Sequence, residues 1–289
     1  MSAEERDPLT GQITTGHEWD GIKELRTPIP NWWLITFIVT WVLSVGYLVL
    51  YPSFATTKGY APGLLGWSSR NELSQATDRA RHQQAVWRDQ ILATPLEKIE
   101  GNEELRRFAV AGGQAAFNEN CAACHGIGAV GQIGQFPSLV DDDWLWGGKI
   151  TDIHTTIRHG IRGESDDTRT SEMPAFGEIL SAEEIAATAD YVLSLSDRSS
   201  ETSRATMPGA ELFATNCSSC HGDNGEGNRD FGAPRLNDAI WLYGGSRAAV
   251  IRQITQPRMG QMPTWETRLD ESTIRMLAVY VHTLGGGEK

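Results

Sequence analysis

The pentapeptide Cys121-Ala-Ala-Cys124-His125 constrains this chain most, because it returns 96 residues later as Cys217-Ser-Ser-Cys220-His221. These two segments contain all four cysteines of the 289-residue sequence. Positions i, i+3 and i+4 share one face of a helical turn, so each turn presents two thiols and an imidazole together. That arrangement attaches haem c through two thioethers and places the histidine on the iron. The sequence therefore predicts two covalently bound haem c groups, with covalent links at Cys121, Cys124, Cys217 and Cys220 and axial ligands His125 and His221.

Three other uses of paired cysteines fit less well. In a zinc ribbon the two Cys-x-x-Cys pairs are usually about 15–20 residues apart, and four ligands converge on one ion. A thioredoxin-like dithiol would require a βαβ context, which the sequence lacks. Structural disulfides would not explain why a histidine follows both pairs at the same position.

Residues 32–51, WWLITFIVTWVLSVGYLVLY, contain no charged side chain. Twenty helical residues span about 30 Å, the thickness of a membrane's hydrocarbon core. A tryptophan pair at one end and Tyr47 and Tyr51 at the other are typical of an aromatic belt, and Pro52 ends the helix. A buried core helix would show a polar stripe, and the apolar region of a cleaved signal is shorter, about 7–15 residues. We therefore predict one transmembrane helix.

The other predicted segments follow from composition and repetition. Residues 1–31 are polar, and 52–105 form a linker with an amphipathic helix that Pro95 ends. From residue 106 the chain is a tandem repeat, 106–199 and 205–286. The matched positions are Gly113 with Gly209 and Phe117 with Phe213 at an offset of 96, Trp144-Leu-Trp-Gly-Gly148 with Trp241-Leu-Tyr-Gly-Gly245 at 97, and Met173-Pro174 with Met262-Pro263 and Tyr191 with Tyr280 at 89. Neither repeat alternates as strands do, so the predicted fold is all-α: a transmembrane helix followed by two cytochrome c domains.

The paired Met-Pro dipeptides predict the sixth ligands of the irons. Met173 and Met262 lie 48 and 41 residues after the histidine of their own repeat. Proline keeps the residue before it out of the helical region, so each methionine is expected on an extended segment over the haem. Met173 is thus assigned to the iron of His125, and Met262 to that of His221. The rival ligands are His154 or His159 in the first repeat and Met259 in the second.

Filled axial positions leave the iron without an open site for substrate, so electron transfer is the expected function. No serine triad, paired-carboxylate site or phosphate loop is evident, and we expect no catalytic residues in this chain. The net charge of −12 argues against nucleic-acid binding. The first repeat holds 7 basic and 14 acidic residues, and residues 205–289 hold 8 and 9. A basic partner is therefore expected to dock on the first repeat, with Asp141, Asp142 and Asp143 as candidate contacts. The alternative is that these acids are ordinary solvated surface or face other subunits.

The chain resembles the dihaem P-subunit family of cbb3-type cytochrome c oxidases over nearly its full length. The resemblance rests on the tandem haem motifs, the single anchor, and three segments: Thr14-Thr-Gly-His-Glu-Trp-Asp-Gly-Ile22, Pro30-Asn-Trp-Trp33 and Ala93-Thr-Pro-Leu96. It implies that electrons arrive from a quinol–cytochrome c oxidoreductase through a donor cytochrome c. They would pass to the monohaem O subunit, and the catalytic N subunit would reduce oxygen while pumping protons. It also implies a bacterial inner-membrane location with both haem domains in the periplasm.

Two other functional classes stay open at this point. The chain could be the cytochrome subunit of a periplasmic dehydrogenase, which co-purifying proteins would reveal. It could also be a dihaem peroxidase, which would leave one haem with a vacant sixth position.

Overall fold

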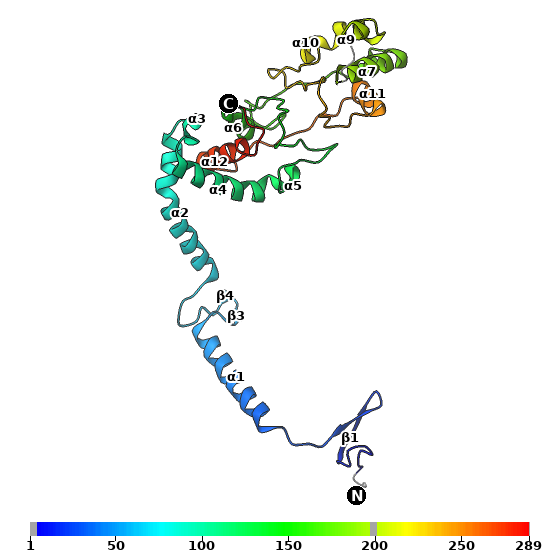
Figure 1. Cartoon of the computed structure of the whole chain (residues 1–289). Coiled ribbons are helices and arrows are strands. Elements are labelled where there is room, and N and C mark those ends of the chain that lie inside the picture. The colour runs from blue at the N-terminus through cyan, green and yellow to red at the C-terminus, as the bar shows by residue number, and fades with distance from the viewer. Residues whose placement is uncertain (1–4, 197–200, 289) are drawn as a thin grey trace. The chain divides into compact units, whose positions relative to one another are not determined.

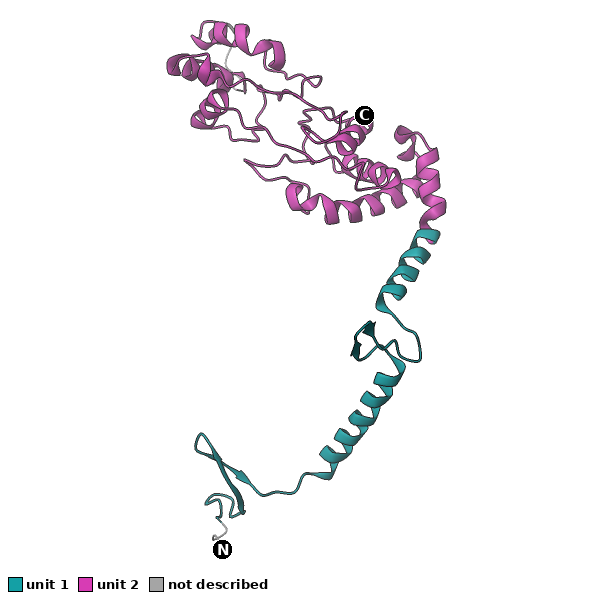
Figure 2. Cartoon of the chain, turned by 180° about the vertical axis from the view of Figure 1, so that it is seen from behind, with its two compact units in different colours: residues 1–82 teal, residues 83–289 magenta. Residues whose placement is uncertain are grey.

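The computed structural model describes residues 5–196 and 201–288, and the chain divides into two compact units, residues 1–82 and 83–289 (Figure 2). Both units are built from helices, apart from two short hairpins in the first. The all-α prediction is confirmed.

The first unit begins with a hairpin of β1 (Thr14–Trp19) and β2 (Ile22–Leu25), paired antiparallel. Its two-residue turn is Asp20-Gly21, with φ of 48° and 82°. Positive φ at both central positions is the geometry of a type I′ turn, for which Asp-Gly is a preferred sequence. The polarity of residues 1–31 alone does not predict this hairpin, although the Asp-Gly pair is a recognisable signal for it.

Helix α1 (Asn31–Leu50) is long and apolar enough to cross a membrane, with a mean hydropathy of 2.1 and no buried residue. Its bounds agree with the predicted 32–51 to within one residue. The chain then turns through the small hairpin β3 (Ala55–Thr56) and β4 (Gly59–Tyr60). Beyond it, the amides of Leu64 and Leu65 each donate to one of the last carbonyls of α1, both at 3.0 Å. These bonds satisfy carbonyls that a helix end leaves unpaired.

Helix α2 (Ser69–Ala93) ends two residues before Pro95, as the sequence predicts, and its residues from 83 belong to the second unit. The rest of that unit is a set of helices joined by long loops (Figure 1). In chain order these are α3 (Leu96–Ile99), α4 (Glu103–Asn120), α5 (Ala122–His125), α6 (Ile150–His159), the 3₁₀ turn η1 (Phe176–Glu178), α7 (Ala182–Ser196), α8 (Glu201–Ala205), α9 (Gly209–Asn216), α10 (Ser218–His221), α11 (Arg247–Thr255) and α12 (Glu271–His282).

The helices of the two repeats exchange partners. Helix α12, from the end of the second repeat, packs on α4 and α6 of the first (Figure 1). Helix α7, from the end of the first repeat, packs on α9 and α11 of the second. The two hydrophobic cores therefore each draw on both repeats, and neither sequence repeat is a packing unit by itself.

Each exchanged helix pair meets at a glycine and is held by an aromatic contact. A side chain at Gly113 of α4 would collide with the backbone of Met276 and with Tyr280, and one at Gly209 of α9 would collide with Ala187 and Tyr191. The rings of Phe117 and Tyr280 lie 5.4 Å apart, and those of Phe213 and Tyr191 lie 5.2 Å apart. Close helix approach requires the missing Cβ atoms.

Two arginines join the end of α2 to the start of α12. Arg88 donates from Nη1 to the Asp270 carboxylate at 3.1 Å and to the Ser272 hydroxyl at 2.8 Å. Arg275 of α12 donates to the carbonyl of Thr94, beyond the end of α2, at 2.9 Å. Because each arginine binds groups at the other helix's terminus, the last turns of α2 are held firmly against the second unit.

Candidate haem sites

The first cysteine-histidine segment forms one tight helical turn. The amides of Cys124 and His125 donate to the carbonyl of Cys121 at 3.1 and 3.0 Å, so both cysteines and the histidine lie on a single turn. Gly126, with φ of 77°, ends it. The Nδ1 of His125 is 3.1 Å from the carbonyl of Pro137 and donates to it as Nδ1–H. Nε2 then keeps its lone pair, which is the form that binds a metal.

The second segment repeats this geometry closely. The amides of Cys220 and His221 donate to the carbonyl of Cys217 at 3.2 and 3.0 Å, and Gly222 ends the turn with φ of 80°. The Nδ1 of His221 is 3.0 Å from the carbonyl of Pro234. The two turns therefore present the same two thiols and one imidazole nitrogen on the same backbone arrangement.

One cysteine and the histidine of each turn are at least half-buried, whereas Cys124 and Cys220 are exposed. All four cysteines are free thiols, and burial raises the pKa of both Cys121 and Cys217 to about 11. Burial lowers the pKa of His125 and of His221, against the effect of the proline carbonyls. A neutral imidazole is the ligand form. Cys121 packs against one hydrophobic core and Cys217 against the other, so the two pairs do not converge on one zinc ion.

Each Met-Pro methionine packs in the core that contains the cysteine turn of the other repeat. Met262 packs against the core that holds Phe117 and Cys121, whereas Met173 packs against the core of Phe213 and Cys217. Distance along the sequence predicts Met173 opposite His125 and Met262 opposite His221, and the structure places each methionine in the other core. The reason is the helix exchange. Each methionine lies shortly before the C-terminal helix of its repeat, and that helix packs in the core of the other repeat's cysteine turn.

The rival ligands have other contacts. His154 on α6 is 2.9 Å from the carboxylate of Glu271 through Nε2, and burial lowers its pKa. His159 places Nδ1 3.3 Å from the Ser165 hydroxyl and 3.4 Å from Glu266. Met259 is exposed.

Two arginine–aromatic pairs were not anticipated from the sequence. Arg169 stacks over Trp146 at 5.4 Å and Arg258 over Tyr243 at 5.2 Å. Each arginine lies four residues before the Met-Pro of its repeat, so a repeated Arg-x-x-x-Met-Pro pattern was the available signal. Within the described chain, the buried Nε of Arg169 has no acceptor. A buried donor of this kind fits the carboxylate of an added group such as haem.

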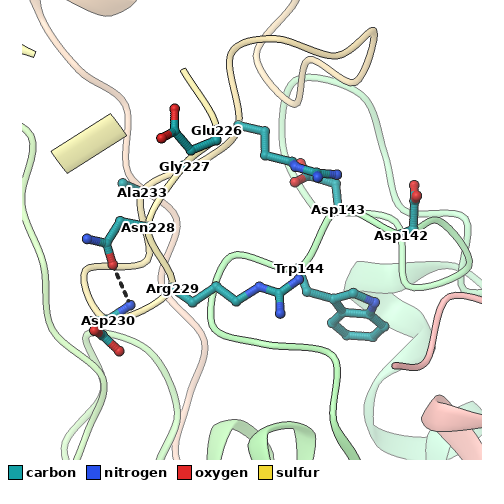
Figure 3. A pocket seen from close by; sticks show the side chains of 10 residues that line it. Asp142, Asp143, Trp144, Glu226, Gly227, Asn228, Arg229, Asp230 and Ala233 are labelled. Atoms are coloured by element: carbon teal, nitrogen blue, oxygen red, sulfur yellow. Dashed lines mark hydrogen bonds between the residues drawn. The ribbon is translucent and has the colours of Figure 1, made fainter. Parts of the chain in front are cut away.

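A polar pocket of 380 Å³ lies between the loops of the two repeats (Figure 3). Asp142, Asp143 and Trp144 form one side, and residues 226–230 face them across the opening. Burial, followed by the neighbouring Asp238 and Asp141, raises the pKa of Asp143 to about 6. None of the predicted haem ligands lines this pocket, but the amide of Gly227, which does, donates to the carbonyl of His221 at 2.7 Å.

Comparison with known proteins places the chain in a family. The profile described as the N-terminal domain of cytochrome oxidase-cbb3, FixP, matches residues 11–58. The profile described as cytochrome C oxidase, cbb3-type, subunit III, matches residues 108–192 and again 204–281. The chain belongs to the FixP/CcoP family of cbb3-type cytochrome c oxidase subunits.

The relatives are similar over their full lengths. FixP of Azorhizobium caulinodans is 48% identical over 98% of this chain and 96% of its own. CcoP of Azospirillum brasilense is 48% identical over 100% of both chains, and CcoP of Cereibacter sphaeroides is 48% identical over 95% of both. The chain is therefore a c-type cytochrome subunit of a respiratory oxidase, and c-type haem is the cofactor its two cytochrome domains imply.

Proposed function

We propose that this chain is a membrane-anchored dihaem cytochrome that takes electrons from a donor cytochrome c and passes them to the monohaem O subunit of a cbb3-type oxidase. The oxygen-reducing site belongs to the catalytic N subunit. The observation that carries the proposal is the pair of equivalent turns, each with two free thiols and an imidazole whose Nδ1 is already bonded. The family membership supplies the oxidase context.

The cysteines would attach each haem covalently, and a histidine and a methionine would fill the two axial positions of its iron. Cys121 and Cys124 hold one haem, and Cys217 and Cys220 hold the other. Once bound, haem supplies a one-electron couple, and a methionine opposite the histidine raises its potential. We assign the axial pairs as His125 with Met262 and His221 with Met173, following the shared cores rather than the sequence order.

The anchor sets the location. Helix α1 is proposed to cross the bacterial inner membrane once, with residues 1–30 in the cytoplasm and everything beyond residue 51 in the periplasm. Haem attachment to cysteines takes place on that side in the proteins this chain resembles. The donor is proposed to be a soluble or membrane-bound cytochrome c reduced by a quinol–cytochrome c oxidoreductase.

A pyridine haemochrome assay on the full-length chain tests the cofactor, with two haem c per chain expected. Tagged chain purified from membranes should bring the N and O subunits with it. Recovery of a dehydrogenase instead, or peroxide binding to the reduced chain, would contradict the oxidase assignment.

A further inference from the structure

The first repeat contains eight residues that the second lacks, since the offset between matched positions falls from 97 to 89 across them. These residues, 161–168, form a closed loop. The amide of Arg169 donates to the carbonyl of Gly160 at 3.1 Å, so the residues flanking the loop are held together as if they were neighbours. Loop 161–168 is thus an insertion into the fold that the two repeats share.

This loop lies against the segment that carries Met262. Ile161 donates its amide to the carbonyl of Met262 at 3.0 Å and accepts the amide of Met262 at 2.9 Å. The Nε of Arg162 donates to the carbonyl of Gly260 at 2.8 Å. Both the methionine and the chain just before it are therefore bonded to residues 161–162.

The chain just after Met262 is bonded to the same loop. Thr264 is only 8% exposed, and its hydroxyl donates to the carbonyl of His159 at 2.9 Å and accepts the amide of Ser165 at 3.2 Å. The Ser165 hydroxyl donates to Glu266 at 2.9 Å, and Arg158 donates to the same carboxylate at 3.2 Å. The loop therefore grips the Met262 segment on both sides.

The loop supports the other methionine less. Within the described part of the chain, the backbone of Met173 makes no hydrogen bond. At the matched positions after it, Ala175 replaces Thr264 and Gly177 replaces Glu266, so the hydroxyl and the carboxylate are both missing. One contact is shared, because the carbonyl of Ser171, which matches Gly260, accepts from Nη1 of Arg162 at 2.9 Å.

We propose that loop 161–168 is a clamp that holds Met262 on the iron of His125, so that this site resists displacement of its methionine by outside ligands. The His221/Met173 site, which the loop holds only through the bond from Arg162 to Ser171, is the exchangeable one. Displacing a methionine requires its segment to move, and for Met262 that movement breaks buried hydrogen bonds at Ile161 and Thr264. Thr264 and Ser165 are positioning residues in this scheme, which rests on the proposed axial pairs.

The test uses the full-length, haem-loaded chain and imidazole as the competing ligand. Methionine bound to ferric haem gives a weak far-red charge-transfer band. In a Met173→Leu chain this band reports only the Met262 site, and in a Met262→Leu chain only the Met173 site. We expect imidazole to abolish the Met262 band with a Kd at least about tenfold higher than for the Met173 band, because several bonds must break.

Variants of the clamp sharpen this test. Thr264→Ala, which installs the residue of the other repeat, should lower the imidazole Kd of the Met262 site about fivefold to tenfold. Thr264→Ser should restore it, and Thr267→Ala, an exposed threonine nearby, should leave it unchanged. Ser165→Ala keeps the amide bond to Thr264 and tests the same clamp if Thr264→Ala does not fold.

Equal imidazole affinities at the two sites, or a Thr264→Ala effect no larger than that of Thr267→Ala, would overturn the clamp. Absence of the far-red band from the unaltered chain would instead defeat the proposed methionine ligands. The two failures are therefore distinguishable.

Discussion

The two cysteine-histidine turns are alike in backbone but differ in the loops that follow them. Both histidines bind a proline carbonyl, 12 residues on in the first repeat and 13 in the second. The loop after the first turn exposes three aliphatic side chains: Ile127 at 80%, Val130 at 64% and Ile133 at 88%. At an offset of 96 the second loop exposes three charged side chains: Asp223, Glu226 and Arg229.

The difference shows which positions haem attachment constrains and which it leaves free. The turn must present two thiols and one imidazole lone pair, so its geometry repeats. The solvent-facing positions carry no such requirement, so their residue types can suit the solvent or the protein that each loop contacts. Exposed aliphatic groups suit a lasting contact with another subunit, whereas charges suit steered, salt-sensitive encounters.

The largest expected effect tests the proposed axial pairs, His125 with Met262 and His221 with Met173. In a chain with Cys217→Ala and Cys220→Ala, only the first turn can attach haem. Met262→Leu should then abolish the far-red band and open the iron to carbon monoxide, and Met173→Leu should leave both unchanged. Covalent attachment at Cys121 should survive either change, because the thioethers do not involve methionine. The reverse result would restore the pairing within each repeat.

A double-mutant cycle measures the helix exchange directly. Truncating a buried aromatic such as Phe117 or Tyr280 should cost about 3–5 kcal/mol of unfolding free energy. The rings of these two residues are in contact, so we expect a coupling energy of about 1 kcal/mol between them. The cycle of Phe117 with Tyr191, the aromatic of its own repeat, should give about zero. Coupling to Tyr191 instead would mean that the repeats fold separately.

The pH dependence of stability should reveal a buried carboxyl that only the first repeat has. The pKa of Asp143 rises from 3.8 to about 6 on folding, so between these values the folded chain holds a proton that the unfolded chain has released. Stability should therefore fall as pH rises through this window and stay lower above it. The second repeat has Ile240 at the matched position and contributes no such group.

Asp143→Asn should remove the loss of stability that ionisation of Asp143 causes. At pH 7 we expect a gain of about 1 kcal/mol, allowing for solvent screening of a half-buried carboxyl. The melting temperature should rise by about 2–4 °C, with no change below pH 4. Thermal unfolding of both chains across pH 3–8 measures this. A gain that persists at pH 3 would show that Asp143 acts through packing and not through ionisation.

The smallest expected effect concerns the donor. The acid-rich first repeat predicts that a basic cytochrome c docks there, but of the three candidate aspartates only Asp142 is exposed. Asp142→Asn should slow electron entry about twofold at low salt and converge with the unaltered chain at high salt. Glu226→Gln in the charged second loop should do less. A larger effect of Glu226→Gln would move the docking surface to the second repeat.

Much of the architecture follows from local sequence. The twenty residues without charge predict α1, Pro95 predicts the end of α2, and Cys-x-x-Cys-His predicts both ligand turns, because each is decided by spacing and by proline within a few residues. The Asp20-Gly21 hairpin has an equally local signal.

The helix partners, and the core in which each methionine packs, were decided only by the tertiary structure. The repeats carry the same glycine, phenylalanine and tyrosine at the helix crossings, so Gly113 could accept Tyr191 as well as Tyr280. A sequence pattern that satisfies both pairings equally cannot choose between them. Once the C-terminal helices are exchanged, each Met-Pro segment lies in the opposite core. The inserted loop then contacts Met262 through Ile161, which lies about 100 positions before it along the chain.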